Sequence, residues 1–197
     1  MDHPDWPAFM AAILAEPDDD TVRLVAADFL EENGDPDRAA FIRIQCALAL
    51  LEREGRGGWH ETRELRTKEN AFLGPLSMFR LLWAAEACPE LVRVKPPPRG
   101  ASPLAMPQVE GADRLVWRRG FVDEVRCPAA EWLKHGIAVR KRQPVTGVLL
   151  HRGREVQRDE WYAHLDALRG LAWVRLDEFY EEWLRAWLPG TEVSGPF

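Results

Sequence analysis

Hydrophobic positions in the first half of the chain repeat with helical spacing. The clearest case is the run 21–33, where apolar residues fall at i, i+3, i+4, i+7 and i+8: Val22, Val25, Ala26, Phe29 and Leu30. Acidic residues at 18–20 favour the positive end of a helix dipole, and Gly34 is suited to a C-terminal cap. The pattern therefore predicts an amphipathic helix with both ends marked.

Further helices are expected on either side of this one. Asp5 and Pro7 indicate an earlier helix that Pro17 stops. Asp35 and Pro36 form an N-cap and a first helical residue, and they open a helix with a predicted apolar face. That face is expected to contain Phe41, Ile44, Leu48 and Leu51. Two more helices are predicted over 59–73 and 76–87.

Short β-like runs alternate with helix-like runs in the second half. The strand-like runs cover 121–127, 145–150 and 172–176, and the helix-like runs between them cover 129–142 and 160–170. One valine in each strand-like run marks a rung, at spacings of 23 and 26: Val125, Val148 and Val174. One strand and one helix per 20–29 residues is the spacing of leucine-rich repeats, so parallel strands in one sheet are expected.

Proline and glycine divide the chain. Residues 96–111 are rich in Pro and cannot form a helix interior or a central strand, so they are expected to be a linker. A β-hairpin with Gly120 in its turn is predicted just before the first rung, and a closing helix over 178–190. The predicted fold is α+β, with an N-terminal helical bundle (1–95) and a short leucine-rich-repeat-like α/β solenoid of mostly parallel strands (112–197), ending in a capping helix.

Charge is unevenly distributed along the chain. Residues 1–98 hold 11 basic and 18 acidic residues, whereas residues 114–158 hold 11 basic and 4 acidic ones. The whole chain has a net charge of −6. A basic band of this kind either attracts an anionic partner or is neutralised within the fold. The three cysteines are far apart, which is typical of a reducing cytoplasm, and no apolar run is long enough to span a membrane.

Residues 15–49, AEPDDDTVRLVAADFLEENGDPDRAAFIRIQCALA, carry a longer motif. This stretch resembles the bacterial repeat-companion domain, a helical module found mostly at the N-terminus of proteins with leucine-rich or other repeats. FLGPL (72–76) and WRRGFVDEV (117–125) extend the resemblance, which covers roughly 8–85 and 114–176. The matching positions are Asp18, Asp20, Arg23, Leu24, Asp28, Leu30, Glu31, Gly34, Asp35, Pro36, Phe41, Ile42, Arg43 and Gln45.

The chain departs from the family pattern at three positions, with Ala26, Phe29 and Ala40 standing where Tyr, Trp and an acid are usual. The resemblance implies a helical module followed by repeats and supplies no catalytic residue. Among the matching residues, Arg23 and Arg43 are expected to bridge to Asp28 or Glu31 and to orient two helices.

No recognisable catalytic or metal-binding motif occurs. The five histidines show no paired-ligand spacing, and no cofactor or metal is expected. Nucleophilic catalysis would require Cys127 beside His135 or His151, whereas a cysteine in a strand is more typically a core residue. A small-molecule substrate and an enzymatic activity are therefore not expected.

The remaining pattern favours a cytoplasmic protein–protein interaction module: an adaptor, a scaffold or an accessory subunit of a larger complex. The expected partner surface is the strand side of the repeats together with the last helix: Asp123, Arg126, Thr146, Arg175, Trp183 and Trp187. The alternative is an accessory nucleic-acid-binding protein that uses the basic band 114–158. Its candidate contacts are Arg118, Arg119, Lys134, Arg140, Lys141, Arg142, Arg152 and Arg154.

Overall fold

The computed structural model describes residues 3–74, 77–100, 102, 107–176 and 182–195. The chain forms two compact units. The first comprises Met1–Leu82 together with Trp117–Val122, and the second comprises Trp83–Val116 and Asp123–Phe197. The division falls within a helix after residue 82, whereas the sequence placed the boundary at the Pro-rich segment. A short later stretch of the chain returns to the first unit.

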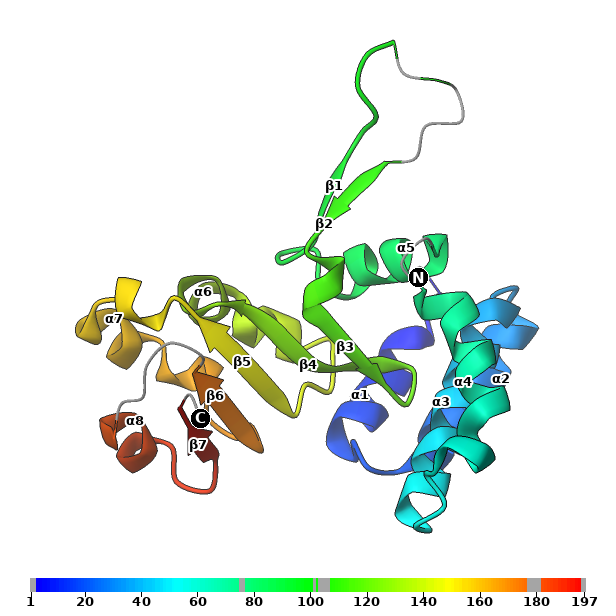
Figure 1. Cartoon of the computed structure of the whole chain (residues 1–197), viewed down its shortest axis with the longest axis horizontal. Coiled ribbons are helices and arrows are strands. Elements are labelled where there is room, and N and C mark those ends of the chain that lie inside the picture. The colour runs from blue at the N-terminus through cyan, green and yellow to red at the C-terminus, as the bar shows by residue number, and fades with distance from the viewer. Residues whose placement is uncertain (1–2, 75–76, 101, 103–106, 177–181, 196–197) are drawn as a thin grey trace. The chain divides into compact units, whose positions relative to one another are not determined.

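Helices make up the first unit (Figure 1). They are α1 (Trp6–Ala15), α2 (Asp20–Glu32), α3 (Pro36–Arg53), α4 (Trp59–Leu73) and the beginning of α5 (Met78–Ala87). The helices expected over 21–33 and 59–73, and from Pro36, are confirmed. The predicted N-caps of α2 and α3 are confirmed as well, because Asp19 and Asp35 accept hydrogen bonds from the backbone N–H groups of Thr21 and Arg38.

The buried face of α2 is rotated from the predicted one. Val25 is 51% exposed, whereas Arg23, Ala26 and Ala27 are buried. The small side chains of this face allow α2 to pack extensively against α3. The core of the unit joins residues of α1, α2 and α3 to Phe121: Ile13, Ala26, Ala27, Leu30, Ala39, Ile42, Cys46 and Phe121.

Arg43 bridges α2 and α3 as the sequence predicts, with Nη2 lying 2.6 Å from both Asp28 Oδ1 and Glu31 Oε2. The same prediction was wrong for Arg23. Its Nη2 instead donates to the carbonyl oxygen of Pro17 at 2.6 Å, and its guanidinium lies 5.1 Å from the centre of the Phe121 ring. Burial of Arg23 against that ring explains why it is directed to the core rather than to Asp28.

The turn at 119–120 is fastened to the first unit by Gln45. The Gln45 side chain accepts from the backbone N–H of Gly120 at 2.7 Å and donates to the carbonyl oxygen of Trp117 at 3.1 Å. It also donates to Glu69 Oε1 at 2.8 Å. Gly120 has φ +86°, and a Cβ there would lie 2.3 Å from Cγ1 of Ile42. Two motifs of the family resemblance, around Gln45 and around Gly120, therefore meet in space.

The second unit is built on a mixed sheet with the strand order β3-β4-β5-β6-β7. The strands are β3 (Leu115–Arg118), β4 (Phe121–Pro128), β5 (Gly147–His151), β6 (Trp173–Leu176) and β7 (Glu192–Ser194). β3 and β4 form the predicted hairpin, whose turn residues belong to the first unit. The strands from β4 to β7 are mutually parallel, so the expected sheet of mostly parallel strands is confirmed.

Valines stand in register across the parallel strands. Val125 pairs with Val148, Val148 with Val174, and Val174 with Val193. The three rungs expected from the sequence are therefore correct, and Val193 adds a fourth that the sequence did not reveal. All four side chains are buried. They form the central row of the unit's core.

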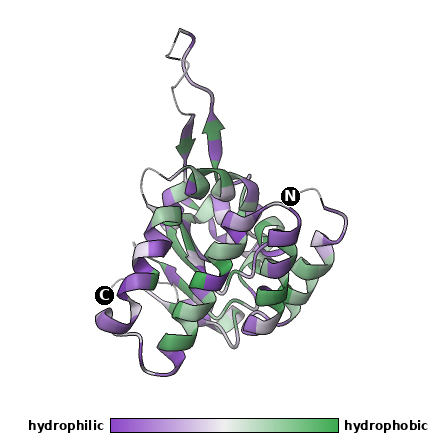
Figure 2. Ribbon diagram, turned by 90° about the vertical axis from the view of Figure 1, so that its right-hand side faces the viewer, coloured by the Kyte–Doolittle hydropathy of each residue, from purple (hydrophilic) through white to green (hydrophobic). Residues whose placement is uncertain are grey.

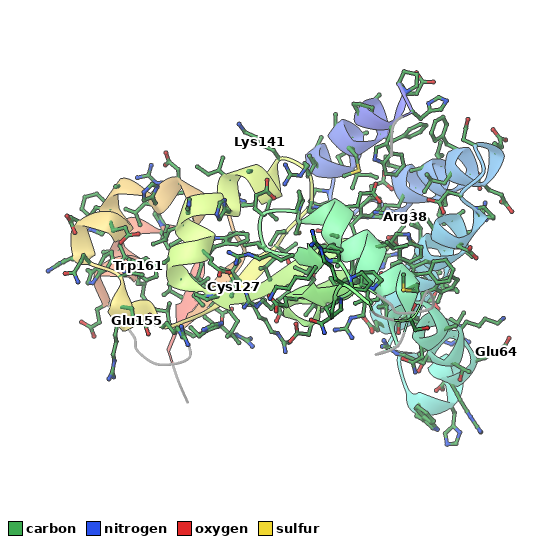
Figure 3. The ribbon with its side chains drawn as sticks, turned by 90° about the horizontal axis from the view of Figure 1, so that it is seen from above. Arg38, Glu64, Cys127, Lys141, Glu155 and Trp161 are labelled. Carbon is green, nitrogen blue, oxygen red and sulfur yellow. The ribbon has the colours of Figure 1, made fainter. Side chains whose placement is uncertain are left out.

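Helices and short 3-10 helices connect the strands of the second unit, and η1 precedes β3. These are α6 (Ala129–Arg140), α7 (Arg158–Ala163) and α8 (Glu182–Trp187), with the 3-10 helices η1 (Ala112–Arg114), η2 (Gly153–Glu155) and η3 (Leu165–Ala167). α8 is shorter than the closing helix predicted over 178–190, since residues 188–191 lead into β7 instead. The N-terminal part of that predicted helix lies outside the described residues. Trp161 of α7 is fully buried and is labelled in Figure 3.

The Pro-rich segment lies between two paired strands, β1 (Arg93–Lys95) and β2 (Gln108–Glu110). Their antiparallel register joins Arg93 to Glu110, Val94 to Val109 and Lys95 to Gln108. The two ends of the expected linker are thus held side by side in one unit, where Figures 1 and 2 show them as a pair of strands. None of the helices in the described part of the chain is long and apolar enough to cross a membrane.

Candidate partner-binding surfaces

The two faces of the parallel sheet differ in exposure. Arg126, Leu149, Arg175 and Ser194 stand in one register row, on the opposite side of the strands from the buried valines. Arg126 and Arg175 are exposed, and Leu149 and Ser194 are half-buried. We call this side the open face, and its members are Glu124, Arg126, Leu149, Trp173, Arg175, Glu192 and Ser194.

An aromatic ring lies at the centre of the open face. Trp173 pairs with Gly147 of the neighbouring strand, and its indole covers that glycine so closely that a Cβ there would lie 1.9 Å from the ring. The guanidinium of Arg175 lies 5.0 Å from the centre of the same ring. Gly147 therefore makes room for a flat, half-exposed tryptophan with a cation beside it.

The two arginines of the open face differ in their partners. Arg126 Nε lies 2.6 Å from Glu124 Oε1, and its side chain is still 55% exposed. Within the described part of the chain, Arg175 has no carboxylate within ion-pair distance. A guanidinium that stacks on an aromatic ring and still faces solvent can accept a carboxylate from another molecule. Among the described residues of this face, Arg175 is thus the cation that has no carboxylate partner.

The structure does not bring all four expected strand residues onto one face. Asp123 and Arg126 are three positions apart on β4, so their side chains point to opposite sides of the sheet. Thr146 Oγ1 donates to Asp123 Oδ1 at 2.9 Å, and Thr146 N donates to the Asp123 carbonyl oxygen at 2.9 Å. These two residues fasten the beginnings of β4 and β5 together, and only Arg126 and Arg175 belong to the open face.

Trp183 and Trp187 form a second surface with residues of α7. The ring of Tyr162 lies 5.1 Å from that of Trp183 and 5.5 Å from that of Trp187, measured between ring centres. The Arg158 guanidinium lies 5.5 Å from the Trp183 ring and 5.7 Å from the Tyr162 ring. Trp187 is 49% exposed and Tyr162 is 37% exposed. We call these four residues the aromatic cluster.

Three residues of the expected basic band are used within the fold. Arg119 is buried and lies 2.6 Å from Asp18 Oδ1 and 3.1 Å from Asp20 Oδ1. The hydrogen bond from Arg119 lowers the pKa of Asp18. Burial opposes the charged form of Arg119, but the two carboxylates outweigh it and raise its pKa. Arg140 and Arg142 are engaged in the second unit.

Arg140 and Arg142 stabilise the chain around α6. Arg140 Nη1 donates to the carbonyl oxygen of Arg169 at 2.7 Å, and burial lowers the pKa of Arg140. Arg142 is paired with Glu90. These contacts explain part of the positive charge between 114 and 158 as internal pairing, which is one of the two interpretations that the sequence left open.

The other five candidate nucleic-acid contacts of the basic band are exposed. Lys134 lies on α6, Lys141 follows its end (Figure 3), and Arg152 and Arg154 lie at the turn after β5. Arg152 Nε is 3.9 Å from Glu155 Oε1 in a pair exposed at both ends. Arg118, in the first unit, lies 3.6 Å from Glu52. These exposed cations come from several separate elements rather than from one strand or helix.

The cysteines are enclosed. Cys46, Cys88 and Cys127 are buried, and burial raises the pKa of each thiol to about 12. A thiol with such a pKa is neutral at pH 7 and is a poor nucleophile and metal ligand. The residues that the structure describes contain no group of three or more His, Cys, Asp or Glu side chains that could hold a metal ion.

We expect the native protein to resist thiol reagents. At pH 8 all three cysteines should react with 5,5′-dithiobis(2-nitrobenzoate) at least about a hundredfold more slowly than in urea, because a pKa near 12 leaves little thiolate and burial blocks access. The reaction is followed by absorbance. Rapid modification of one cysteine under native conditions would show that the unit containing it opens locally.

Comparisons of the chain with family models, with curated proteins and with solved structures gave no match.

Proposed function

We propose that the chain is a non-catalytic protein–protein interaction module and that its partner lies on the open face. The observation that carries this proposal is the half-exposed Trp173, seated over Gly147, with the stacked cation of Arg175 beside it. Trp and Arg are the residue types enriched at the energetic centres of protein interfaces. Leu149 and Arg126 extend the same surface across the neighbouring strands.

The finer architecture that we propose is a short leucine-rich-repeat-like arc. Parallel strands with valines in register support it, as do the spacings of 23 and 26 residues between the first three rungs. In such arcs the strand side presents rows of side chains to a partner. The resemblance of residues 15–49 to repeat-companion modules supports a role as an adaptor, a scaffold or an accessory subunit in the cytoplasm.

The proposal is tested by the paired substitution of Arg126 and Arg175 with alanine. Affinity purification from the native host and mass spectrometry first identify the proteins captured by the wild-type chain. Affinity for the captured protein should then fall roughly 30-fold, equivalent to about 2 kcal/mol, because charged and stacking contacts at the interface centre are lost. Calorimetric titration measures the affinity, and the melting temperature should be unchanged because both side chains are exposed.

A matched control removes the same charge elsewhere in the second unit. Lys134 and Arg154 are both exposed, and neither lies on the open face. Their paired replacement by alanine should leave the affinity within about twofold of wild type, because distant surface charges contribute little. Equal affinity of the Arg126/Arg175 variant and wild type would remove the open face as the binding surface.

The alternative function, nucleic-acid binding, is tested by substituting only those basic residues that are exposed. Reversing Arg140 or Arg142 would disturb internal contacts. The informative variant therefore reverses Lys134, Lys141, Arg152 and Arg154. If the rival is correct, the wild-type chain binds a labelled oligonucleotide at about 50 mM salt, and the affinity falls steeply as salt rises. Loss of that binding in the variant would favour the rival over the interaction module.

A further inference from the structure

The Pro-rich arm, residues 93–110, is the part of the second unit that the proposed function does not use. Its described strands, β1 and β2, extend side by side from the rest of the second unit in both views (Figures 1 and 2). Its base is held by the β1–β2 pairing and by an ion pair of 2.5 Å between Lys95 Nζ and Glu110 Oε1. From this base, residues 96–100 continue the chain, and all of them are exposed.

The prolines that follow β1 restrict the backbone conformation of the arm at residues 96–98. Residues 96–98 are three consecutive prolines, whose rings hold φ near −65°. Each residue that precedes a proline is also kept out of the helical region, which applies to Lys95, Pro96 and Pro97. These restrictions leave one turn of polyproline II helix, which needs no internal hydrogen bonds. Gly100, with φ +86°, ends it in a turn.

The polyproline turn is free to meet another molecule. All residues from 93 to 100 are exposed. Polyproline II has three residues per turn, so Pro96 and Arg99 lie along one edge and Lys95 and Pro98 along the next. Lys95 is engaged with Glu110, whereas Arg99 has no carboxylate within ion-pair distance in the part of the chain that the structure describes. The described residues 96–99 thus present a rigid apolar ridge, and the guanidinium of Arg99 at its end is available to a partner.

We propose that this arm is a recognition ligand, whose residues 96–99 dock into an aromatic-lined groove on a second protein, with a carboxylate there receiving Arg99. Aromatic grooves bind polyproline II segments because this helix is already ordered before binding and therefore loses little conformational entropy when it binds. A carboxylate at one end of the groove would pair with the guanidinium in a bidentate manner. This contact is independent of the open face.

A protein groove explains the arm better than a nucleic acid does. Phosphate binding requires several cations, because each neutralised phosphate adds to the affinity. The described residues of the arm hold Arg93, Lys95 and Arg99, and one of these is already paired with Glu110. Two available cations beside three prolines favour apolar docking with a single charged anchor.

The experiment titrates the full chain with recombinant SH3, WW and EVH1 domains, which between them represent the common aromatic grooves for polyproline II. Each domain is first shown to bind its own proline-rich peptide. At least one should bind the wild-type chain, and the paired replacement Pro97→Ala and Pro98→Ala should weaken that binding by about tenfold or more, because the preformed helix is lost. Arg99→Ala should weaken it by about threefold to tenfold.

Pro4→Ala serves as the matched control, since Pro4 is exposed and lies outside the arm, and it should bind as the wild type does. The proposal is overturned if no domain of the panel binds the chain, or if the double proline variant binds as tightly as wild type. It is also overturned if the arm instead binds duplex DNA in a strongly salt-dependent manner that Arg93→Ala and Arg99→Ala abolish.

Discussion

Replacing Gly120 with alanine should destabilise the first unit by about 2–5 kcal/mol. A Cβ at this position would lie 2.3 Å from Cγ1 of Ile42 and 3.0 Å from its Cα, so the hairpin turn would be forced away from α3. The positive φ of +86° adds a backbone cost for any residue other than glycine. Displacement of this turn would also weaken or break the hydrogen bond from Gly120 N to Gln45 Oε1.

Gly34→Ala is the matched control for this substitution. Gly34 has φ +88°, but no atom lies within 4 Å of the position that its Cβ would take. It should therefore cost only the backbone contribution, about 1–2 kcal/mol. Urea unfolding followed by circular dichroism measures both variants. If both lose the same stability, the turn does not pack on Ile42 as described.

Replacing Trp132 with alanine should destabilise the second unit by about 3–5 kcal/mol, the usual cost of emptying a large buried aromatic site. Trp132 is fully buried on α6, and its ring fills the space beside Gly136 of the same helix. Its Nε1–H donates to the carbonyl oxygen of Ala167 at 3.1 Å and so joins α6 to η3. The variant loses both the packing and this connection.

Trp132→Phe separates the two contributions. It keeps most of the apolar contact and removes the donor, so it should cost about 1–3 kcal/mol. The same urea titration gives the comparison, with the Trp132→Ala variant measured in parallel. A cost below about 1 kcal/mol for Trp132→Ala would mean that the site is not enclosed as described.

The local pattern of apolar, capping and turn residues was sufficient to predict most helices and strands of the fold. The helices at 20–32 and 36–53 have both periodic apolar residues and N-capping side chains, and these caps mark where the helices begin. Val125, Val148 and Val174 sit in short runs of β-branched residues between turn residues, so their strands were also readable. The fourth rung at Val193 was missed because β7 has three residues and lacks such a run.

Contacts between residues far apart in the sequence could not be predicted from the sequence. Gln45 holds backbone groups 72 and 75 residues away, and nothing near Gln45 in the sequence indicates those partners. The direction in which α2 faces was also set by tertiary packing, which buried Arg23 and exposed Val25. Helical periodicity defines a face only to within about one residue when small side chains stand on both sides of it.

The composition of the open face could have been worked out in part. Once the valines were aligned, Arg126 and Arg175 had to share a row, and strand alternation already excluded Asp123 from that row. The seating of Trp173 over Gly147 required the register between two strands and the rotamer of the ring, which only the folded structure supplies. The ion pairs of Arg119 and Arg142 and the hydrogen bond from Arg140 to a backbone carbonyl oxygen could not be predicted either, because each joins segments far apart in the chain.

The first unit includes residues 117–122, which follow the Pro-rich arm in the chain. A gene fragment that ends at residue 95 would therefore encode a helical bundle without Phe121, whose ring is completely buried in its core. Recombination at a single point near residue 95 would therefore separate the hydrophobic core of the first unit from Phe121, one of its buried residues. Recombination that preserves both units has to carry the whole stretch from the first helix to the end of the hairpin.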